Sequence, residues 1–212
     1  MSAAEIYRAV RRERLIAIVR GSAEEEIVNI AEALHQGGVT LMEITANTPG
    51  VMEMIRTVSQ VMAGRMLIGA GTIVTPDLAR EAVRAGARYV IAPDVNPEVI
   101  GFCVERGLAV IPGAATPTEI LSAGRLGAKM IKLFPAGSLG LGYLKDLRGP
   151  LDQVDLVAVG GVTPENGAEF LRAGCVGVGI GSSLIRRDLV RAKNWDGLTA
   201  LARRAISRLG AV

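Results

Sequence analysis

The sequence predicts an α/β protein built as a (β/α)8 barrel, the TIM-barrel fold, with one additional helix at the N-terminus. Three observations lead to this prediction. Short apolar runs recur along the 212-residue chain, amphipathic stretches separate them, and a Gly precedes most of the apolar runs. Near-continuous apolar strands that alternate with amphipathic helices are typical of a parallel sheet covered by helices. Eight such units in about 200 residues fit a small closed barrel.

The expected strands are eight apolar runs. They cover residues 15–19, 39–44, 66–70, 89–92, 108–111, 130–133, 156–159 and 176–180. A glycine stands shortly before five of them, at Gly38, Gly86, Gly107, Gly127 and Gly174. Each of these glycines is expected to end the preceding helix in the left-handed conformation, which glycine adopts at the lowest steric cost.

The stretches between the expected strands have the features of helices. Ile27, Ile30, Ala31 and Leu34 follow the spacing of one buried helical face. Four helix starts are predicted where a capping side chain precedes Pro, at Thr75, Asn96, Thr116 and Thr163. Thr116 and Glu119 have the spacing of a capping box. Residues 3–13 are expected to form the additional helix, which would close the bottom of the barrel.

An open doubly wound sheet is the structural alternative. Such a sheet usually has fewer strands and a Gly-rich turn after the first one. Here that turn reads Arg20-Gly21-Ser22, which is not a dinucleotide-binding fingerprint. No long polar, Ser-rich or Pro-rich segment divides the chain, so we expect residues 1–212 to form a single barrel domain.

Composition argues against several classes of function. The net charge is +3, the basic residues are interleaved with acidic ones, and only 3% of the residues are aromatic, so nucleic-acid binding is not expected. No apolar run approaches the ~18–20 residues that a membrane span needs. The first 14 residues are too polar for a signal peptide, and Cys103 and Cys175 lack metal or redox spacing. We therefore expect a cytoplasmic protein in a reducing compartment.

Lys132 is the first candidate catalytic residue, because it lies in the middle of an apolar strand. Side chains alternate between the two faces of a strand, so Ile131 and Leu133 would pack against helices while Lys132 points into the barrel. Burial lowers the pKa of an amine and favours the neutral form that attacks carbonyl groups. The alternative is a lysine at a strand end whose amine reaches water.

Glu43 is the second candidate, and the same alternation turns it inward while Met42 and Ile44 face helices. A partly buried carboxyl group has a raised pKa and can transfer protons. An aldolase that forms a Schiff base needs both groups: an amine that serves as the electron sink, and an acid/base for dehydration and for C–C cleavage. The alternative is a structural ion pair between Glu43 and Lys132.

A metal-dependent mechanism is not favoured by the sequence. Metal-dependent aldolases usually assemble several His and carboxylate ligands. The single histidine, His35, belongs to a helix end far from the expected active face. We therefore expect no metal and no other cofactor.

Two glycine-rich turns predict a phosphate site. Gly160 and Gly161 follow the seventh strand, and Gly181, Ser182 and Ser183 follow the eighth strand and are expected to enter a helix. Glycines allow backbone N–H groups to approach a phosphate, and a helix N-terminus adds positive potential. Barrels often bind phosphate between these two loops, in enzymes of quite different chemistry, so the loops alone do not identify the reaction.

Several motifs together resemble one known family. They are Glu43, Gly69-Ala70-Gly71-Thr72, Ile111-Pro112-Gly113, Lys132-Leu133-Phe134-Pro135 and Val159-Gly160-Gly161-Val162. With these motifs the chain resembles the 2-keto-3-deoxy-6-phosphogluconate / 4-hydroxy-2-oxoglutarate aldolases over nearly its whole length. The motif around Lys132, combined with Glu43 on the second strand, is specific.

The resemblance implies a class I aldolase, a carbon–carbon lyase that produces pyruvate and glyceraldehyde 3-phosphate, usually as a homotrimer. Lys132 would form the imine and Glu43 would move protons. The partner would be a small phosphorylated keto acid. The pyruvate pocket would use Thr72, Pro93 and Pro112. The full set of expected substrate-binding residues is Arg20, Asn47, Thr72, Pro93, Pro112, Phe134, Val159, Gly160, Gly161, Gly181, Ser182 and Ser183.

Two departures from the gluconate-type pattern are informative. Many gluconate-type members carry an Arg four residues after the catalytic Glu, where this chain has Asn47, and a Thr where it has Val159. Arg20, at the end of the first strand, could supply the missing charge. Both departures resemble the 2-keto-3-deoxy-6-phosphogalactonate branch, whose substrate differs at the C4 hydroxyl. The motifs leave the preference between the two epimers open.

Two other functions are compatible with the phosphate loops. A phosphosugar isomerase or synthase would carry the same loops but would not need an inward lysine on the sixth strand. A non-catalytic barrel that binds phosphate would not need Lys132 paired with Glu43. The inward pair therefore favours the aldolase.

Overall fold

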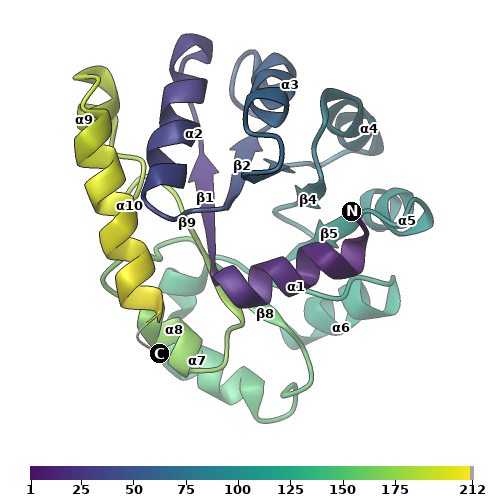
Figure 1. Ribbon diagram of the computed structural model, residues 1–212. Coiled ribbons are helices and arrows are strands. Elements are labelled where there is room, and N and C mark those ends of the chain that lie inside the picture. Colours follow the sequence, from purple (N-terminus) through teal and green to yellow (C-terminus); the bar gives the residue numbers. More distant parts are fainter. Residues whose placement is uncertain (211–212) are drawn as a thin grey trace.

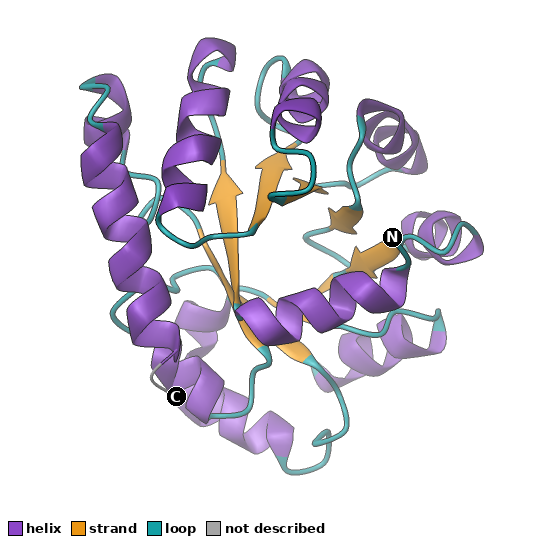
Figure 2. Cartoon of the chain, viewed as in Figure 1, coloured by secondary structure: helices purple, strands orange, loops and turns teal. Residues whose placement is uncertain are grey.

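The computed structural model describes residues 1–210, in which nine parallel strands form a nearly closed barrel surrounded by helices (Figures 1 and 2). The strands are β1 (Leu15–Val19), β2 (Leu41–Thr45), β3 (Leu67–Gly71), β4 (Tyr89–Ile91), β5 (Ala109–Ile111), β6 (Gly113–Ala114), β7 (Ile131–Leu133), β8 (Leu156–Val159) and β9 (Gly177–Ile180). Their order is β5-β4-β3-β2-β1-β9-β8-β7-β6, and every pairing is parallel. The predicted barrel is confirmed.

The helices follow the strands in the expected alternation. They are α1 (Ala3–Glu13), α2 (Ile27–Gln36), α3 (Val51–Val61), α4 (Pro76–Ala85), α5 (Pro97–Glu105), α6 (Pro117–Arg125), α7 (Ala136–Arg148), α8 (Gly167–Arg172), α9 (Arg187–Arg191) and α10 (Trp195–Gly210), with a short 3-10 helix η1 (Glu24–Glu26). Among the described residues, no helix is both long and apolar enough to span a membrane.

The fifth expected strand differs from the prediction because it is divided in two. β5 pairs with β4, and β6 pairs with β7, while Pro112 stands between the two segments. Proline has no N–H to donate to a ladder, so a break at this residue has a physical cause. Gly113 also lies so close to the carbonyl of Pro93 that a Cβ there would be 2.3 Å from the oxygen. The ring of strand hydrogen bonds is therefore open at one seam, between β5 and β6.

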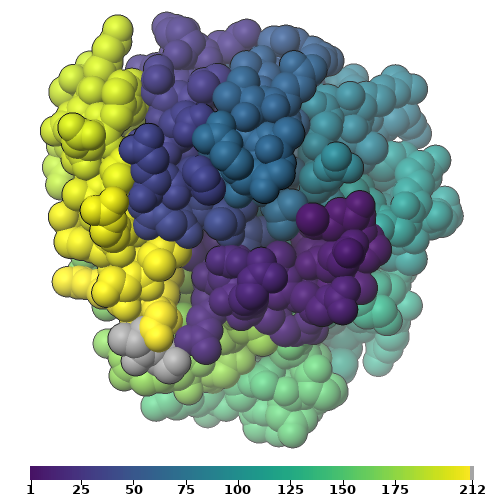
Figure 3. Space-filling view, in the orientation of Figure 1, coloured from purple at the N-terminus to yellow at the C-terminus, as the bar shows by residue number. Residues whose placement is uncertain are grey.

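The additional helix is present, and α1 closes one end of the barrel. Ile6, Tyr7 and Val10 are buried in the inner core cluster, together with inward residues of the strands such as Leu41 and Tyr89. The hydroxyl of Tyr7 donates to the carbonyl oxygen of Val110 (3.2 Å) and accepts from the N–H of the same residue (3.1 Å). Figure 3 shows this face, with α1 in purple lying across it. The opposite end, at the carboxyl ends of the strands, carries the loops that follow each strand.

Local signals in the sequence explain most helix boundaries. The five glycines expected to end helices all have positive φ, between 62° at Gly107 and 111° at Gly86. Thr75, Asn96 and Thr116 cap helices that begin with Pro, and Thr116 forms the predicted capping box with Glu119. The amphipathic face of α2 is buried as predicted.

Two predicted helix starts are wrong. α8 begins at Gly167 rather than at Thr163-Pro164. The side chain of Asn166 accepts from the N–H of Thr163, and the side chain of Thr163 accepts from the N–H of Asn166, so these two residues form a separate turn before the helix. The loop after β9 does not enter a helix directly. The N–H groups of Leu184 and Ile185 both donate to the carbonyl of Gly181, which forms a turn, and the five-residue α9 begins only at Arg187.

Candidate active site

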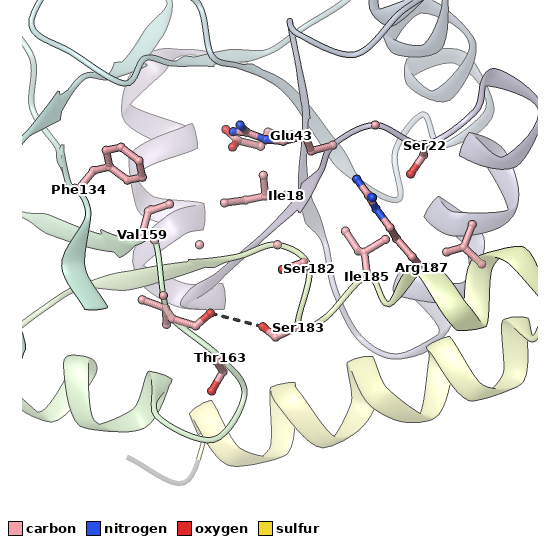
Figure 4. Close-up of a pocket in the computed structure, with 18 of the residues that line it drawn as sticks. Ile18, Ser22, Glu43, Phe134, Val159, Thr163, Ser182, Ser183, Ile185 and Arg187 are labelled. Atoms are coloured by element: carbon pink, nitrogen blue, oxygen red, sulfur yellow. Dashed lines mark hydrogen bonds between the residues drawn. The ribbon is translucent and has the colours of Figure 1, made fainter. Parts of the chain in front are cut away.

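A cavity of about 650 Å³ opens at the carboxyl ends of β1, β2, β7, β8 and β9. Ten of the fourteen residues expected in the site line it: Arg20, Glu43, Lys132, Phe134, Val159, Gly160, Gly161, Gly181, Ser182 and Ser183. Figure 4 shows how Glu43 and Phe134 lie on one side of this cavity and the loop of Ser182 and Ser183 on another. Residues that are distant in the sequence therefore form one site.

Lys132 is the central residue of β7, and its side chain is 6% exposed. Its neighbours Ile131 and Leu133 belong to the outer core cluster against the helices, as the alternation predicts. Burial lowers the pKa of Lys132, and the charge of Arg20 lowers it further, while Glu43 raises it. Because burial is the largest of these effects, the neutral amine is favoured relative to an exposed lysine.

Glu43 lies on β2 and is 2% exposed. Burial raises the pKa of Glu43 to about 7, against the opposing effects of Lys132 and Arg20. Its Oε2 atom is buried and has no hydrogen-bond partner among the described residues. The carboxyl group passes over Gly71 of β3, where a Cβ would lie 2.7 Å from the Glu43 Cδ. Glycine at this position therefore leaves the space that the Glu43 side chain occupies.

The two buried groups influence each other across the barrel without direct contact. Within residues 1–210, Glu43 and Lys132 form no ion pair at 4 Å or less. The Lys132 Nζ instead lies 4.6 Å from the centre of the Phe134 ring. Both groups line the same cavity. A small molecule bound there can therefore contact both of them.

Arg20 follows β1 and reaches the neighbouring strands. Its Nη2 lies 3.4 Å from the Oγ1 of Thr72, to which it donates. Thr72 has a φ of 58°, in the left-handed region that β-branched residues rarely adopt. Strained backbone of this kind clusters at ligand sites. Arg20 and Thr72 together provide a cation and a hydroxyl group beside the mouth of the cavity.

The two glycine-rich loops lie next to each other at the other side of the cavity. Gly160 and Gly161 both have positive φ, at 86° and 72°. The hydroxyl of Ser183 lies 3.5 Å from the carbonyl of Val162, which links the loop after β9 to the loop after β8 (Figure 4). Ser182 is exposed at the rim. Glycine backbone and hydroxyl groups in this arrangement can bind an anion.

The cavity also contains cations that the sequence analysis missed. Arg187 and Arg191 of α9 line it, and the figure shows the Arg187 side chain extending toward the Ser22 loop (Figure 4). A Cβ at Gly21 would lie 3.6 Å from the Arg187 Nη2. No ion pair of Arg187 is found among the described residues. The signal available in the sequence was an arginine four residues after the Ser182-Ser183 loop. The turn before α9 returns the chain to the cavity and so places this arginine there.

Four expected site residues do not line the cavity. Asn47 is exposed on the turn after β2, and Pro93 follows β4. The hydroxyl of Thr72 accepts from Arg20, which does line the cavity. Pro112 is buried, and its carbonyl accepts from the N–H of Lys132 (2.9 Å), so it supports the lysine strand.

The arrangement combines a buried amine, a carboxyl group whose pKa is raised to about 7, the Arg20–Thr72 pair, and two adjacent glycine- and serine-containing loops. Such a set can form an imine with a keto acid and transfer protons around it. No group of three His, Cys, Asp or Glu side chains within residues 1–210 is arranged to hold a metal ion.

Comparisons with known proteins agree with this chemistry. The family model described as "KDPG and KHG aldolase" matches residues 6–201. A 2-dehydro-3-deoxy-6-phosphogalactonate aldolase of Escherichia coli is 38% identical over 173 residues, 81% of this chain and 84% of the relative. A 2-dehydro-3-deoxy-phosphogluconate aldolase of Treponema pallidum is 34% identical over 97% of this chain and 98% of the relative.

Solved structures show the same similarity. A KDPG aldolase of Legionella pneumophila, with pyruvate captured as a covalent carbinolamine intermediate, has a TM-score of 0.88 at 30% identity and covers 93% of this chain and 96% of its own. A structure described as native KDPGal has a TM-score of 0.81 at 35% identity, with 91% and 96% covered. A designed protein cage made "by fusing symmetric oligomeric domains" is 34% identical with a TM-score of 0.82, and 93% of this chain and 74% of that chain are covered.

Proposed function

Since the chain belongs to the KDPG and KHG aldolase family and is therefore a carbon–carbon lyase, we propose that it cleaves a 2-keto-3-deoxy-6-phospho-aldonate into pyruvate and glyceraldehyde 3-phosphate through a Schiff base on Lys132. The observation that carries this proposal is the amine of Lys132, which is buried at the cavity wall with a lowered pKa. We also propose that the chain works as a single barrel domain.

The first half of the reaction joins the substrate to the enzyme. The neutral Lys132 amine attacks the C2 carbonyl and gives a carbinolamine, whose hydroxyl leaves as water once it has been protonated. Glu43, with its pKa raised to about 7, supplies that proton. A group that titrates near the working pH can donate and accept protons with little cost, which suits this role.

The second half breaks the carbon–carbon bond. The carboxylate of Glu43 takes the proton of the C4 hydroxyl, directly or through water. The C3–C4 bond electrons then move into the protonated imine and give an enamine. Glyceraldehyde 3-phosphate leaves as the aldehyde. Protonation of the enamine at C3 restores an imine, and water hydrolyses it to free pyruvate and the Lys132 amine. All bonds and protons balance without a metal or redox group.

The substrate would lie across the cavity with an anion at each end. Arg20 and Thr72 would hold the keto-acid carboxylate. Gly160, Gly161, Ser182 and Ser183 would hold the phosphate, which the positive φ values and adjacency of the two loops support. Phe134 packs near Lys132 and would cover the imine.

Borohydride trapping tests the nucleophile. Reduction in the presence of pyruvate should add one pyruvate-sized adduct, which peptide mapping should locate at Lys132. Lys132→Arg should abolish turnover because a guanidinium does not form the imine. An adduct on Lys129 or Lys145, or no adduct at all, would reject the assignment. The same experiment separates the aldolase from an isomerase or a non-catalytic barrel.

Substitution of the carboxyl group tests the acid/base. Glu43→Gln should keep the fold and much of the substrate binding and lower kcat by ~10²–10⁴-fold, the usual contribution of a positioned proton shuttle. If kcat is unchanged while stability alone changes, Glu43 has only a structural role.

We further propose that the preferred epimer is the phosphogalactonate type. Val159 lines the cavity and places an apolar side chain where many gluconate-type members carry a hydroxyl group. A buried substrate hydroxyl without a partner is penalised, so loss of this group can shift preference between C4 epimers. Cleavage assays on both epimeric phosphates test this, and Val159→Thr should raise relative kcat/KM for the gluconate epimer. Equal rates with both epimers in the unmodified enzyme would refute the preference.

We propose that the protein is a homotrimer in the cytoplasm. Exposed apolar side chains lie on three successive helices, with Val83 on α4, Val104 on α5, and Leu121 on α6. The free, buried Cys103 and Cys175 suit a reducing compartment. Light scattering after size exclusion should give three times the chain mass, and Val104→Glu combined with Leu121→Glu should give a smaller species. A monomer in the unmodified protein would refute the trimer.

A further inference from the structure

A second cavity, of about 700 Å³, lies at the opposite end of the barrel from the candidate active site. Its wall includes Thr40, Met66 and Arg88, which precede β2, β3 and β4, whereas the active-site residues follow their strands. This is the α1 side of the molecule that Figure 3 presents, and Arg12 of α1 contributes to the wall. The proposed aldolase reaction uses none of these residues.

The wall of this cavity is strongly basic. It carries five arginines and no aspartate or glutamate: Arg12, Arg56, Arg65, Arg84 and Arg88. They come from three helices, α1, α3 and α4, and from the segments that lead into β3 and β4. The chain as a whole has a net charge of only +3, so five cations around one hollow are a local concentration of charge. Converging positive charges in a concave site attract anions.

The arginines differ in how far protein groups already neutralise them. Three have acidic partners outside the cavity wall, in the pairs Arg12–Glu13, Arg56–Glu53 and Arg65–Glu32. Arg84 and Arg88 are exposed and form no ion pair among the described residues. At least two guanidinium groups of the wall are therefore available to a ligand.

Polar and apolar groups complete the wall. The Oγ1 atom of Thr40 is buried and has no hydrogen-bond partner within residues 1–210. Because this atom is fully buried, it does not reach a ligand in the cavity. Met66, Ile68 and Ala85 are also buried, and the wall has no aromatic side chain. The volume of about 700 Å³ is far larger than a bare inorganic ion needs, so it fits an organic molecule with charged groups better.

Macromolecular partners fit these features less well. A site for single-stranded nucleic acid normally offers aromatic side chains for base stacking, which this wall lacks. A membrane surface would meet a flat or convex basic patch rather than a hollow. The volume lies within the range typical of small-molecule sites, about 300–1,000 Å³.

We propose that this cavity binds a small organic phosphate with at least two negative charges, such as a nucleoside diphosphate, remote from the catalytic site. Arg84 and Arg88 bind the phosphate groups, because a guanidinium forms paired hydrogen bonds with phosphate oxygens. The other arginines of the wall add positive charge around the bound molecule. The site does not depend on the aldolase assignment, since it shares no residue with that cavity.

Calorimetric titration of the full-length protein with ADP at low ionic strength tests this proposal. ADP should bind, and Arg84→Ala combined with Arg88→Ala should weaken the binding at least tenfold while leaving kcat unchanged. Arg204→Ala, an exposed arginine on α10 outside the cavity, should bind ADP like the unmodified protein.

A second pair of substitutions separates this cavity from the active site. Ser182→Ala combined with Arg187→Ala removes groups from the catalytic cavity only. This variant should therefore still bind ADP in the second cavity. No binding by the unmodified protein overturns the proposal, as does equal binding by the Arg84/Arg88 variant. Loss of binding in the Ser182/Arg187 variant also overturns it, because ADP would then occupy the catalytic cavity.

Discussion

Burial acts in opposite directions on the two ionisable side chains at the centre of the barrel. It raises the pKa of Glu43 to about 7 and lowers the pKa of Lys132, so each group moves toward its neutral form. Each also favours the charged form of the other, and the two groups therefore titrate as a coupled pair. The neutral amine needed for imine formation and the protonated acid needed for dehydration coexist when the pair holds one proton. On the proposed mechanism, desolvation of both residues thus prepares the first step of the reaction.

The raised pKa of Glu43 predicts a pH dependence of stability. Between about pH 4.5 and about pH 7, the folded protein holds a proton that the unfolded chain releases. The unfolding free energy contributed by Glu43 is therefore fully present below pH 4.5 and is lost as the pH rises to about 7. Gln cannot titrate, so Glu43→Gln should gain stability relative to the unmodified protein across this window. Urea unfolding at a series of pH values measures the difference, and a difference that does not change with pH would contradict the burial argument.

Arg20 predicts a selective effect on the keto acid. Asn47 carries no charge, and Arg20 already lies within hydrogen-bond distance of Thr72. A paired Arg–carboxylate contact is strong and oriented. Arg20→Ala should therefore raise the KM for pyruvate in the condensation direction at least about tenfold, near 1.4 kcal/mol, while the KM for the aldehyde changes little. Arg20→Lys should recover part of the loss. An unchanged pyruvate KM would assign the carboxylate to Thr72 and backbone N–H groups instead.

Arg187 predicts the complementary effect at the phosphate end. It lines the cavity beside the Ser182 loop and has no ion-pair partner among the described residues. Arg187→Ala should raise the KM for glyceraldehyde 3-phosphate about tenfold and leave the KM for pyruvate unchanged. Arg186→Ala is the matched control, because Arg186 is paired with Asp188 and does not line the cavity. Equal effects of the two substitutions would mean that Arg187 acts only through the general charge of α9.

At the scale of elements, the seam between β5 and β6 makes α1 part of the barrel wall. β5 pairs with β4 on one side only, and on its open side the Tyr7 hydroxyl bonds both backbone groups of Val110. A side chain of the additional helix thus replaces part of a missing strand ladder. Buried backbone groups left without a partner are costly, which explains why the hydroxyl is needed at this place.

Tyr7→Phe tests the contribution of this contact. The substitution leaves the N–H and the carbonyl of Val110 without their partner in a buried environment, so the unfolding free energy should fall by about 1–3 kcal/mol. Urea unfolding measures the loss, provided that the dependence of the unfolding free energy on urea concentration is the same in both proteins. Tyr143→Phe, which removes one bond to the Ala115 carbonyl at a half-buried position, should cost less. A loss no larger than that of Tyr143→Phe would show that the seam is satisfied in another way.

Features set by local chemistry were predictable from the sequence, and features set by tertiary contacts were not. The inward direction of Glu43 and Lys132 follows from strand alternation, and the positive φ of Gly86 or Gly127 follows from the helix ending there. The break at Pro112 was predictable in part, because proline lacks the N–H of a strand ladder, but the close approach of Gly113 to the Pro93 carbonyl was not. Sequence periodicity contains no information about that contact.

The residues of the candidate site also fall into those that the sequence could predict and those that it could not. Residues at strand ends were found because a parallel barrel brings those ends together. Arg187 was missed because its approach to the cavity depends on the turn over Gly181–Ile185 and on a five-residue helix. The arginines of the second cavity are scattered from Arg12 to Arg88, and none belongs to a motif. Only the folded barrel places them around one hollow.

The molecule as a whole is a barrel with two different ends. One end carries a cavity with a buried amine and carboxyl group, and the other is covered by α1 and bears a basic hollow. The two cavities share no residue, so substitutions in one leave the wall of the other intact. This separation allows catalysis and ligand binding to be measured independently on the same protein.

The helix that covers one end of the barrel also restricts how reactants enter and products leave. With α1 filling that end, ligands reach Lys132 and Glu43 only through the open mouth, past the exposed Ser182 at its rim. Both products leave by this mouth, and on the proposed mechanism pyruvate stays covalently joined to Lys132 until water hydrolyses the imine. We therefore expect the phosphorylated aldehyde to depart first and pyruvate last during cleavage, and pyruvate to be admitted first during condensation. The expected kinetics are those of a compulsory sequence, in which pyruvate alone competes with the cleavage substrate for the free enzyme.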